Sequence, residues 1–279
     1  MAIILDGKAL SAKIRAELKE KLPEIINKKG RAPSLAVVLV GDDPASAIYV
    51  RNKKNDCAEI GITSLEYRLG ADTEEEELLS LIDTLNADKG VDGILVQLPL
   101  PKHLDEKTVI NRISPDKDVD AFHPVNGGLL LKGENKFLPC TPAGVMRLLD
   151  EYNIEIEGKR CVVIGRSNIV GKPMALLLLQ RNGTVTVCHS KTKDLASFTR
   201  EADIIVAAVG RAKLLKGDMI KEGAVIVDVG MNRSDGKLCG DVDFEECEKK
   251  ASYITPVPGG VGPMTRAILM ENAVAASLQ

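Results

Sequence analysis

Short apolar runs bounded by glycine or proline recur along the chain and alternate with segments of helical periodicity. Runs of this kind, rich in Val, Ile and Leu, are typical of strands buried on both faces of a parallel sheet. The alternation therefore predicts an α/β fold. The predicted strands are 35–40, 93–97, 161–164, 184–188, 203–209 and 224–229, and the predicted helices are 10–29, 44–60, 74–87, 143–152, 172–181 and 263–279.

A polar turn over 133–136 interrupts this pattern near the middle of the chain. Thr141 and Pro142 then offer a capping residue and a first-turn proline for a new helix. We place a domain boundary just before this helix, and a chain of 279 residues is long enough for two domains. The pattern leaves open whether the last helix stays with the second domain or returns to the first.

Composition excludes several classes of protein. A net charge of −3 provides no overall basic field to hold nucleic acid. The six cysteines are scattered and form no CxxC pair, which argues against a zinc site or a disulfide framework and favours a reducing compartment. No apolar run approaches the length of a membrane span. We expect a soluble, unprocessed, cytoplasmic protein without a metal site, which binds neither nucleic acid nor membranes.

A strand, a glycine-containing turn and a helix start follow one another over 159–173. Backbone N–H groups at such a helix N-terminus suit a diphosphate. Gly165, Arg166 and Ser167 occupy the turn, although Ser167 stands where GxGxxG has its second glycine and Gly171 comes late. The motif indicates a dinucleotide-binding loop, and an ordinary turn between strand and helix is the alternative.

The residues after the next strand bear on the choice of cofactor. NAD-binding folds place Asp or Glu there to bind the ribose 2′-OH. Here Cys188 is followed by His189, Ser190 and Lys191, with no carboxylate. A carboxylate would repel a 2′-phosphate, whereas Arg166, Ser190 and Lys191 offer hydrogen bonds and positive charge. The sequence therefore predicts NADP rather than NAD.

Four polar residues of the first domain are candidates for catalysis. Tyr49 and Lys53 are spaced i, i+4, so they share one face of a helix that begins at the carboxyl end of a strand. A phenol and an ammonium so placed can exchange a proton or present it to a substrate, and a solvated helix face is the alternative. Gln97 ends a buried strand, where its amide can donate and accept. Asp120 lies on an acidic loop that composition alone predicts to be solvated.

Five motifs, in order along the chain, carry a family resemblance: YVRNK at 49–53, VQLPLP at 96–101, KDVD at 117–120, GRS at 165–167 and PVPGGVGPMT at 256–265. With these motifs the chain resembles the bifunctional methylenetetrahydrofolate dehydrogenase/methenyltetrahydrofolate cyclohydrolase family, from Asp6 to the last helix. The resemblance implies two α/β domains around a cleft, the second a Rossmann-like NADP-binding domain. It also implies that the last helix returns to the first domain and that the protein is a homodimer.

The resemblance further implies the reactions. These are NADP-dependent oxidation of 5,10-methylenetetrahydrofolate to the methenyl form and hydrolysis of that cation to 10-formyltetrahydrofolate. Both belong to one-carbon metabolism, which supplies purine, methionine and histidine biosynthesis. On this basis residues 1–138 with 263–279 are expected to form the folate-binding catalytic domain, and residues 139–262 the NADP-binding domain.

Residue roles follow from the same resemblance. Lys53 is expected to be the central catalytic group, Tyr49 to hydrogen-bond the folate, Gln97 to support Lys53, and Asp120 to anchor the pterin. These four residues are expected to contact the substrate together with Pro258, Gly259 and Gly260, and the cofactor is expected at Gly165, Arg166, Ser167, Ser190, Lys191 and Met231.

The chain departs from the family pattern at two positions. Ala121 follows Asp120 where glycine is expected, and Met231 stands where isoleucine is common. The first departure is expected to alter the loop that holds Asp120. Two other functions are weighed: a dehydrogenase without the hydrolase, and a non-catalytic nucleotide-sensing module. The complete set of Tyr49, Lys53 and Gln97 argues against the first. The second would leave no reason for Tyr49, Lys53 and Asp120.

Overall fold

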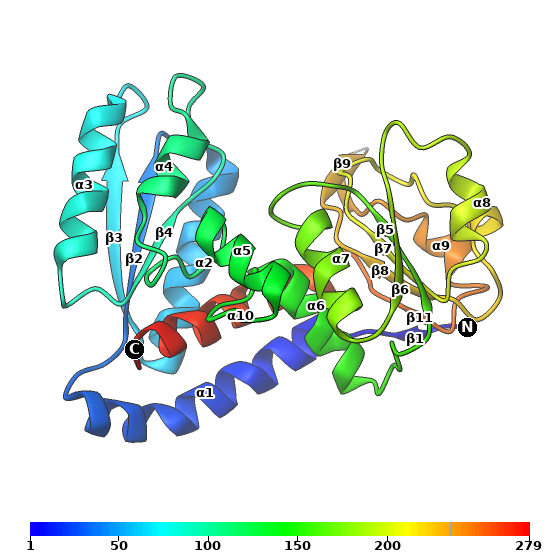
Figure 1. The fold of residues 1–279 in the computed structure, drawn as a ribbon, viewed down its shortest axis with the longest axis horizontal. Helices are drawn as coiled ribbons and strands as arrows, with labels where there is room; N and C mark the ends of the chain where they lie inside the picture. Colours follow the sequence, from blue (N-terminus) through cyan, green and yellow to red (C-terminus); the bar gives the residue numbers. More distant parts are fainter. Residues whose placement is uncertain (235) are drawn as a thin grey trace. The chain divides into compact units, whose positions relative to one another are not determined.

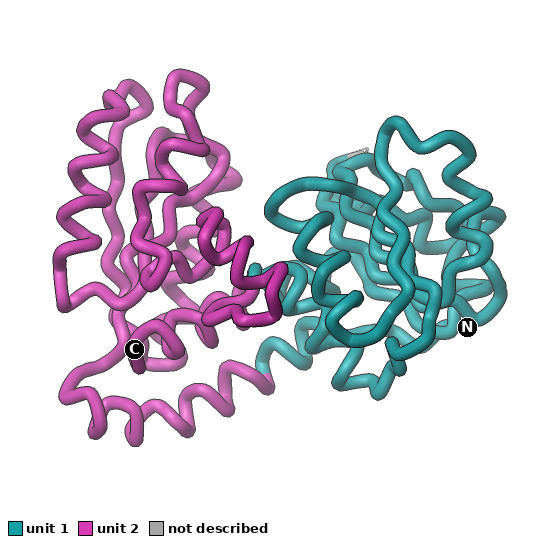
Figure 2. The backbone as a smooth tube through the Cα atoms, viewed as in Figure 1, with its two compact units in different colours: residues 1–12, 139–265 teal, residues 13–138, 266–279 magenta. Residues whose placement is uncertain are grey.

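The computed structural model describes residues 1–234 and 236–279. The chain divides into two compact units, which Figure 2 colours separately: unit 1 comprises residues 1–12 and 139–265, and unit 2 comprises residues 13–138 and 266–279. The division falls within two helices, α1 (Gly7–Lys29) and α10 (Val261–Ala276) (Figure 1). Within the described ranges, no helix combines the length and apolar character that a membrane crossing requires. Each unit contains helices and a parallel sheet, which confirms the predicted α/β fold.

Unit 1 is built on a six-stranded sheet in the order β1-β11-β8-β7-β5-β6, with every pairing parallel. The chain runs from β5 to β6 on one side and then to β7 on the other side of β5. Such a reversal is the switch point at which open α/β sheets bind ligands. The strands are β1 (Ile3–Ile4), β5 (Arg160–Ile164), β6 (Thr184–Cys188), β7 (Ile204–Ala207), β8 (Val225–Asp228) and β11 (Tyr253–Ile254).

Aliphatic side chains from these strands form the core of unit 1, with Ile205 and Ile226 fully buried. The helix predicted after the domain boundary is α6, which begins at Cys140, earlier than predicted. The Thr141 hydroxyl therefore lies inside α6 and shares a hydrogen bond with the Thr265 hydroxyl (2.9 Å) instead of capping the helix. The remaining elements of this unit are α6 (Cys140–Glu151), α7 (Gly171–Gln180), α8 (Leu195–Thr199), η1 (Gly217–Met219), α9 (Phe244–Cys247) and the antiparallel pair β9 (Asn232–Ser234) and β10 (Lys237–Cys239).

Residues 1–12 belong to unit 1, whereas the sequence analysis assigned them to the first domain. β1 extends the sheet of unit 1, with Ile3 opposite Tyr253 of β11. The chain then packs against the glycine-rich segment, since a Cβ at Gly7 would lie 1.8 Å from the Gly260 oxygen. A two-residue strand is too short for hydrophobic periodicity to reveal, so this pairing escapes sequence reasoning.

Unit 2 contains a three-stranded parallel sheet in the order β3-β2-β4. The central strand β2 is buried along its whole length, in keeping with its continuous apolar sequence. The edge strand β3 is partly exposed and alternates polar with apolar residues. It was not predicted because it contains no continuous apolar run. The elements are β2 (Ser34–Val40), α2 (Pro44–Ile60), β3 (Thr63–Leu69), α3 (Glu75–Ala87), β4 (Gly93–Val96), α4 (Glu106–Arg112) and α5 (Pro124–Lys132).

The start of α2 is set by local chemistry. The Asp43 carboxylate accepts a hydrogen bond from the Ser46 N–H (2.7 Å), and Pro44 occupies the first turn. Gly61, at φ 104°, ends the helix in the left-handed conformation that glycine adopts most readily. These signals confirm the predicted helix 44–60 and fix where each of its side chains points.

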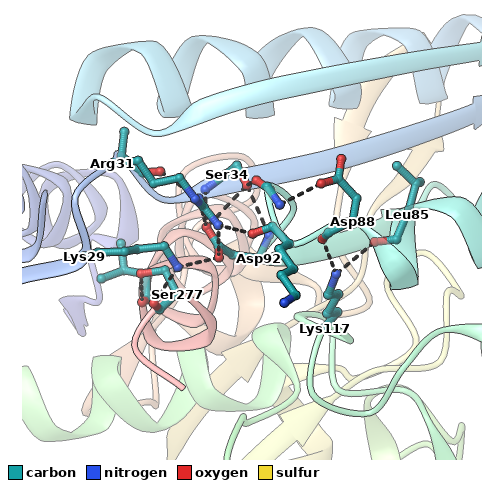
Figure 3. Close-up of polar contacts among 12 residues, drawn as sticks. Lys29, Arg31, Ser34, Leu85, Asp88, Asp92, Lys117 and Ser277 are labelled. Carbon is teal, nitrogen blue, oxygen red and sulfur yellow. Dashed lines mark hydrogen bonds and ion pairs between the residues drawn. The ribbon is translucent and has the colours of Figure 1, made fainter.

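A buried carboxylate joins four segments of unit 2 (Figure 3). Asp92, immediately before β4, accepts two hydrogen bonds from the Arg31 guanidinium (2.7 and 2.8 Å) and one from the Ser34 N–H (2.8 Å). Lys29 Nζ donates to Asp92 (2.6 Å) and also to the Ser277 oxygen (2.7 Å). Asp92 thereby ties the ends of α1 and of the chain to the starts of β2 and β4.

Removal of the Asp92 charge is expected to destabilise the fold in a pH-dependent way. Burial raises the pKa of Asp92, but hydrogen bonds from Arg31 and Lys29 outweigh burial and hold the pKa below its usual value. The stabilisation is therefore present above the unfolded pKa of about 3.9 and is lost as pH falls through the lower folded value. Asp92→Asn should reduce the free energy of unfolding by roughly 2–3 kcal/mol at pH 7, as measured by urea denaturation.

The deficit of Asp92→Asn should shrink as the pH is lowered below about 4. Asp83→Asn is the matched control, since its ion pair with Arg112 is exposed and should contribute little. A deficit that stayed constant down to the acid limit of folding would contradict an ionised role for Asp92.

Candidate functional site

Lys53 and Gln97 meet at the carboxyl end of the sheet in unit 2. Gln97 follows the last residue of β4, and its N–H donates to the Val38 oxygen of β2 (2.8 Å). Lys53 of α2 donates from Nζ to Gln97 Oε1 (2.9 Å), while Gln97 Nε2 donates to the Leu98 oxygen (2.6 Å). The second bond fixes the amide with its oxygen towards the ammonium. The structure thus brings together two of the predicted catalytic residues.

Tyr49 and Cys57 lie one turn before and one turn after Lys53 on α2. Burial raises the pKa of Tyr49, so its phenol is protonated at neutral pH and is able to donate a hydrogen bond. Burial also raises the pKa of Cys57 to about 12, so its thiol is not a nucleophile. Lys53 therefore lies on the helix between two side chains that stay protonated at neutral pH.

The acidic loop over 117–120 is ordered rather than merely solvated. It runs beside β4, where the Ile94 N–H donates to the Lys117 oxygen (2.7 Å). Asp118 is buried and accepts hydrogen bonds from the His123 N–H (2.8 Å) and from Asn126 Nδ2 (2.8 Å). Burial raises the pKa of Asp118, and these donors act against that rise. Asp118 therefore holds the loop from inside.

Asn272 of α10 holds the same loop from the other side. Its buried amide donates from Nδ2 to the Val119 oxygen (2.8 Å) and to the Leu138 oxygen (2.9 Å). Asp120, which follows Val119 in the loop, is only partly buried. Sequence reasoning missed the roles of Asp118 and Asn272, because no spacing links a helix near the end of the chain to a loop near residue 120.

Unit 1 contains a cavity of about 460 Å³ at the carboxyl ends of β5, β6 and β7. Its size is in the range of small-molecule sites. The lining residues include two arginines, and none of the described lining residues is Asp or Glu. The cavity is therefore suited to an anion. Its lining residues include Gly165, Arg166, Ser167, Ser190, Thr192 and Arg211.

Four of the six predicted cofactor residues thus line one cavity, and two lie outside its lining. Lys191 is exposed, and its N–H donates to His189 Nδ1 (3.2 Å). Met231 is 51% exposed, and a Cβ at Gly262 would lie 3.7 Å from its methyl carbon. Met231 therefore lies beside the glycine-rich segment.

Gly165 and Ser167 shape the turn after β5. A Cβ at Gly165, where φ is 131°, would lie 2.2 Å from the Ala208 oxygen, so only glycine lets the loops after β5 and β7 approach so closely. Ser167 Oγ accepts hydrogen bonds from the Val170 N–H (3.1 Å) and the Gly171 N–H (3.2 Å). The serine that replaces a motif glycine thus binds two N–H groups at the start of α7.

Pro258, Gly259 and Gly260 lie in unit 1, whereas Tyr49, Lys53, Gln97 and Asp120 lie in unit 2. The Gly259 oxygen accepts a hydrogen bond from the Lys8 N–H (2.9 Å), which fixes the glycine-rich segment to the start of the chain. The predicted substrate-binding residues therefore form two groups, each held by contacts within its own unit.

Two family models match nearly the whole chain. A model described as "Tetrahydrofolate dehydrogenase/cyclohydrolase, catalytic domain" matches residues 5–120. A second, described as "Tetrahydrofolate dehydrogenase/cyclohydrolase, NAD(P)-binding domain", matches residues 139–279 and so includes the cavity. The chain is 60% identical to the bifunctional protein FolD of Acetivibrio thermocellus, over 100% of this chain and 98% of that protein. It is 59% identical to FolD of Ruminiclostridium cellulolyticum, over 99% and 98%.

Solved structures agree with these matches. The bifunctional FolD dehydrogenase/cyclohydrolase of Campylobacter jejuni superposes with a TM-score of 0.97 at 57% identity, covering 100% of this chain and 99% of that one. The FolD dehydrogenase-cyclohydrolase of Trypanosoma brucei, complexed with NADP cofactor and inhibitor, gives a TM-score of 0.95 at 40% identity, covering 99% and 97%.

The backbone conformation of Ala121 allows a test of how the loop that holds Asp120 tolerates alanine in place of glycine. Ala121 is buried at φ 58°, a left-handed conformation that costs a residue with a Cβ roughly 1–2 kcal/mol. Glycine removes this cost and adds about 0.5–1 kcal/mol of unfolded-state entropy. Ala121→Gly should therefore raise the free energy of unfolding by up to about 1 kcal/mol, measured by urea denaturation. Ala47→Gly, within α2, is the control and should lower it by about 1 kcal/mol. A loss at both positions would mean that Ala121 is unstrained.

Proposed function

The chain belongs to the tetrahydrofolate dehydrogenase/cyclohydrolase family, and from this premise we propose that Lys53, oriented by Gln97, transfers the protons of its hydrolytic reaction. The enzyme is bifunctional: it oxidises 5,10-methylenetetrahydrofolate with NADP and hydrolyses the resulting methenyl cation to 10-formyltetrahydrofolate. These reactions belong to folate one-carbon metabolism. A dehydrogenase without the hydrolase and a non-catalytic sensing module are set aside.

The hydrogen bond between Lys53 and Gln97 carries the proposal. Hydrolysis adds the oxygen of water to the methenyl carbon and releases one proton, which a neutral Lys53 accepts. The bond from that carbon to one folate nitrogen then breaks, and the protonated lysine gives its proton to the nitrogen. The new hydroxyl group becomes the formyl oxygen as it releases its own proton to water, so the cation yields a neutral product and one free proton. Gln97 Oε1 accepts a hydrogen bond from Nζ and so keeps the amine in one position through both steps.

Tyr49 and Asp120 are proposed to bind and orient the folate. The protonated phenol of Tyr49 lies one turn from Lys53 and donates a hydrogen bond to the substrate. The Asp120 carboxylate accepts paired hydrogen bonds from the aminopyrimidine edge of the pterin. Asp118 and Asn272 fix the loop before and after Asp120, so its carboxylate is presented with little loss of entropy.

NADP fits the residues of the unit 1 cavity. The described lining residues of the cavity include two arginines and no carboxylate, and Gly165 lets the loop after β7 come close to the loop after β5 at its edge. When bound, NADP supplies the acceptor for the hydride that the folate loses. Gly165, Arg166, Ser167 and Ser190 are proposed to hold it, and Lys191 and Met231 to contact it from outside this cavity.

We propose that folate binding belongs mainly to unit 2 and NADP binding to unit 1. The catalytic-domain model matches residues 5–120, which include Tyr49, Lys53, Gln97 and Asp120. The NAD(P)-binding model covers the cavity. Pro258, Gly259 and Gly260 are proposed as a second group of substrate contacts. The six free thiols favour a reducing compartment, and the cytoplasm is proposed as the location.

A homodimer is also proposed, and the edge of the six-stranded sheet supports it. β6 is an edge strand, and Val187 on it and Leu179 on the preceding helix are both exposed. Light scattering after gel filtration should give twice the chain mass of 30.0 kDa. Val187→Lys should shift the protein towards monomer, whereas Leu131→Lys, a control at another exposed leucine, should not. A wild-type mass of one chain would contradict the proposal.

Lys53→Met tests the proton-transfer role. With methenyltetrahydrofolate supplied directly, its absorbance should decay at least roughly 100-fold more slowly than with the wild type, because the acid–base group is lost. The NADP dissociation constant should be unchanged, since Lys53 and the cavity lie in different units.

Lys54→Met is the matched control. Lys54 is the next residue on α2, is 59% exposed at its side chain and pairs with Glu66 (3.4 Å). The Lys54→Met variant should hydrolyse the methenyl cation within about 2-fold of the wild-type rate, because an exposed ion pair contributes little to stability. Hydrolysis at the wild-type rate by Lys53→Met would refute the role given to Lys53.

A further inference from the structure

Arg211 is the second arginine that lines the unit 1 cavity, and the proposed function assigns it no role. It lies on the loop after β7, while Arg166 follows β5 and Ser190 follows β6, and all three line the same cavity. Arg211 is exposed, and within residues 1–234 and 236–279 no ion pair involves Arg166 or Arg211. Both guanidinium groups are therefore available to a ligand.

A buried carboxylate fixes the backbone that carries Arg211. Asp241 is fully buried, and its Oδ2 accepts hydrogen bonds from the Val209 N–H (2.6 Å) and the Gly210 N–H (3.0 Å). Its Oδ1 accepts from the Arg211 N–H (2.7 Å) and from Asn232 Nδ2 (2.9 Å). Three successive N–H groups thus converge on one carboxylate, which defines where Arg211 leaves the loop.

The charge of the cavity indicates what Arg211 binds. A phosphate monoester carries between one and two negative charges at neutral pH, and an arginine fork matches its oxygens. Lys191, the second cation expected for the 2′-phosphate, lies outside the cavity lining, whereas Arg211 lies within it. Ser190 and Thr192 add hydroxyl groups from the loop after β6, the loop that faces the ribose 2′ position in dinucleotide-binding folds.

We propose that Arg211, together with Arg166, binds the 2′-phosphate of NADP, and that Asp241 is the residue that positions Arg211. The proposal rests on the proposed function, since it requires that NADP occupies this cavity. It makes Arg211 a determinant of cofactor specificity, because NAD offers no group to its guanidinium.

Arg211→Gln tests the specificity role. Calorimetric titration should show an NADP dissociation constant about 10-fold or more above wild type, because a charge-assisted contact is lost. The NAD dissociation constant should change by less than about 3-fold, because NAD lacks the 2′-phosphate. Lys213→Gln is the matched control: it removes one positive charge from the same loop, where Lys213 pairs with Asp243 outside the cavity lining. It should leave both constants within about 2-fold.

The outcomes separate the inference from the proposed function. An unchanged NADP constant in Arg211→Gln, or an equal rise for NADP and NAD, would overturn the role at the 2′-phosphate. A wild-type protein that binds NADP no better than NAD would instead overturn the cofactor assignment on which the inference rests.

Asp241→Asn tests the positioning role. An amide NH2 cannot accept the N–H bonds that one carboxylate oxygen receives, so the loop should shift and the NADP constant should rise about 10-fold. If Asp241 acts through Arg211, adding Arg211→Gln to this variant should raise the constant by less than about 3-fold further. If the rise in the NADP constant of the double variant equals the product of the two single rises, Asp241 does not act by positioning Arg211.

Gly210→Ala provides a second route to the same loop if Asp241→Asn does not fold. Gly210 has φ 66°, and a Cβ there meets nothing within 4 Å, so the substitution strains the backbone without a clash. It should raise the NADP constant more than the NAD constant. If the NADP and NAD dissociation constants of Gly210→Ala both equal those of the wild type, this loop does not position Arg211.

Discussion

Both candidate sites depend on parallel strand pairing, because parallel strands bring their carboxyl ends and the loops that follow them to one edge of a sheet. In unit 2 the Gln97 N–H donates to the Val38 oxygen, which keeps the end of β4 level with β2, the strand that leads into the helix of Lys53. In unit 1 the loops after β5 and β7 come so close that a Cβ at Gly165 would overlap the chain. Antiparallel neighbours would send successive loops to opposite edges, and neither group of side chains would assemble.

Buried carboxylates then hold the loops that strand pairing gathers. Asp118 and Asp241 accept backbone N–H groups from the loops that they fix, with no arginine or lysine paired to them in the described part of the chain. Asp228 is similar: it accepts three backbone N–H groups, yet burial raises its pKa to about 6. Asp92 is also buried, though less completely, and the cations around it lower its pKa. Neutral donors therefore suffice to place a carboxylate, whereas full ionisation at low pH requires partner charges.

Sequence reasoning found the parts of the fold in which one local pattern decides the outcome. Runs of apolar and β-branched residues predicted β2 and β4 to β8, and local caps predicted α2. The edge strand β3 was missed because half-exposed strands mix polar with apolar residues, and β1 was missed because two residues carry no period. In the sites, motifs pointed to Lys53 and Gln97, which the structure brings together. Arg211 and Asp241 were missed because thirty residues separate them, and only the folded sheet brings the Asp241 carboxylate to the Arg211 N–H.

The side chains proposed for the two ligands differ in kind, and the difference follows from the chemistry. Hydrolysis needs a group that gains and loses a proton, and Lys53 with its amide partner Gln97 is the group proposed for this in unit 2. Holding a dinucleotide needs positive charge that does not change with pH, and the guanidinium groups in unit 1 meet this need because arginine stays protonated in proteins. The chain therefore offers a lysine where a proton has to move and arginines where positive charge has to stay fixed.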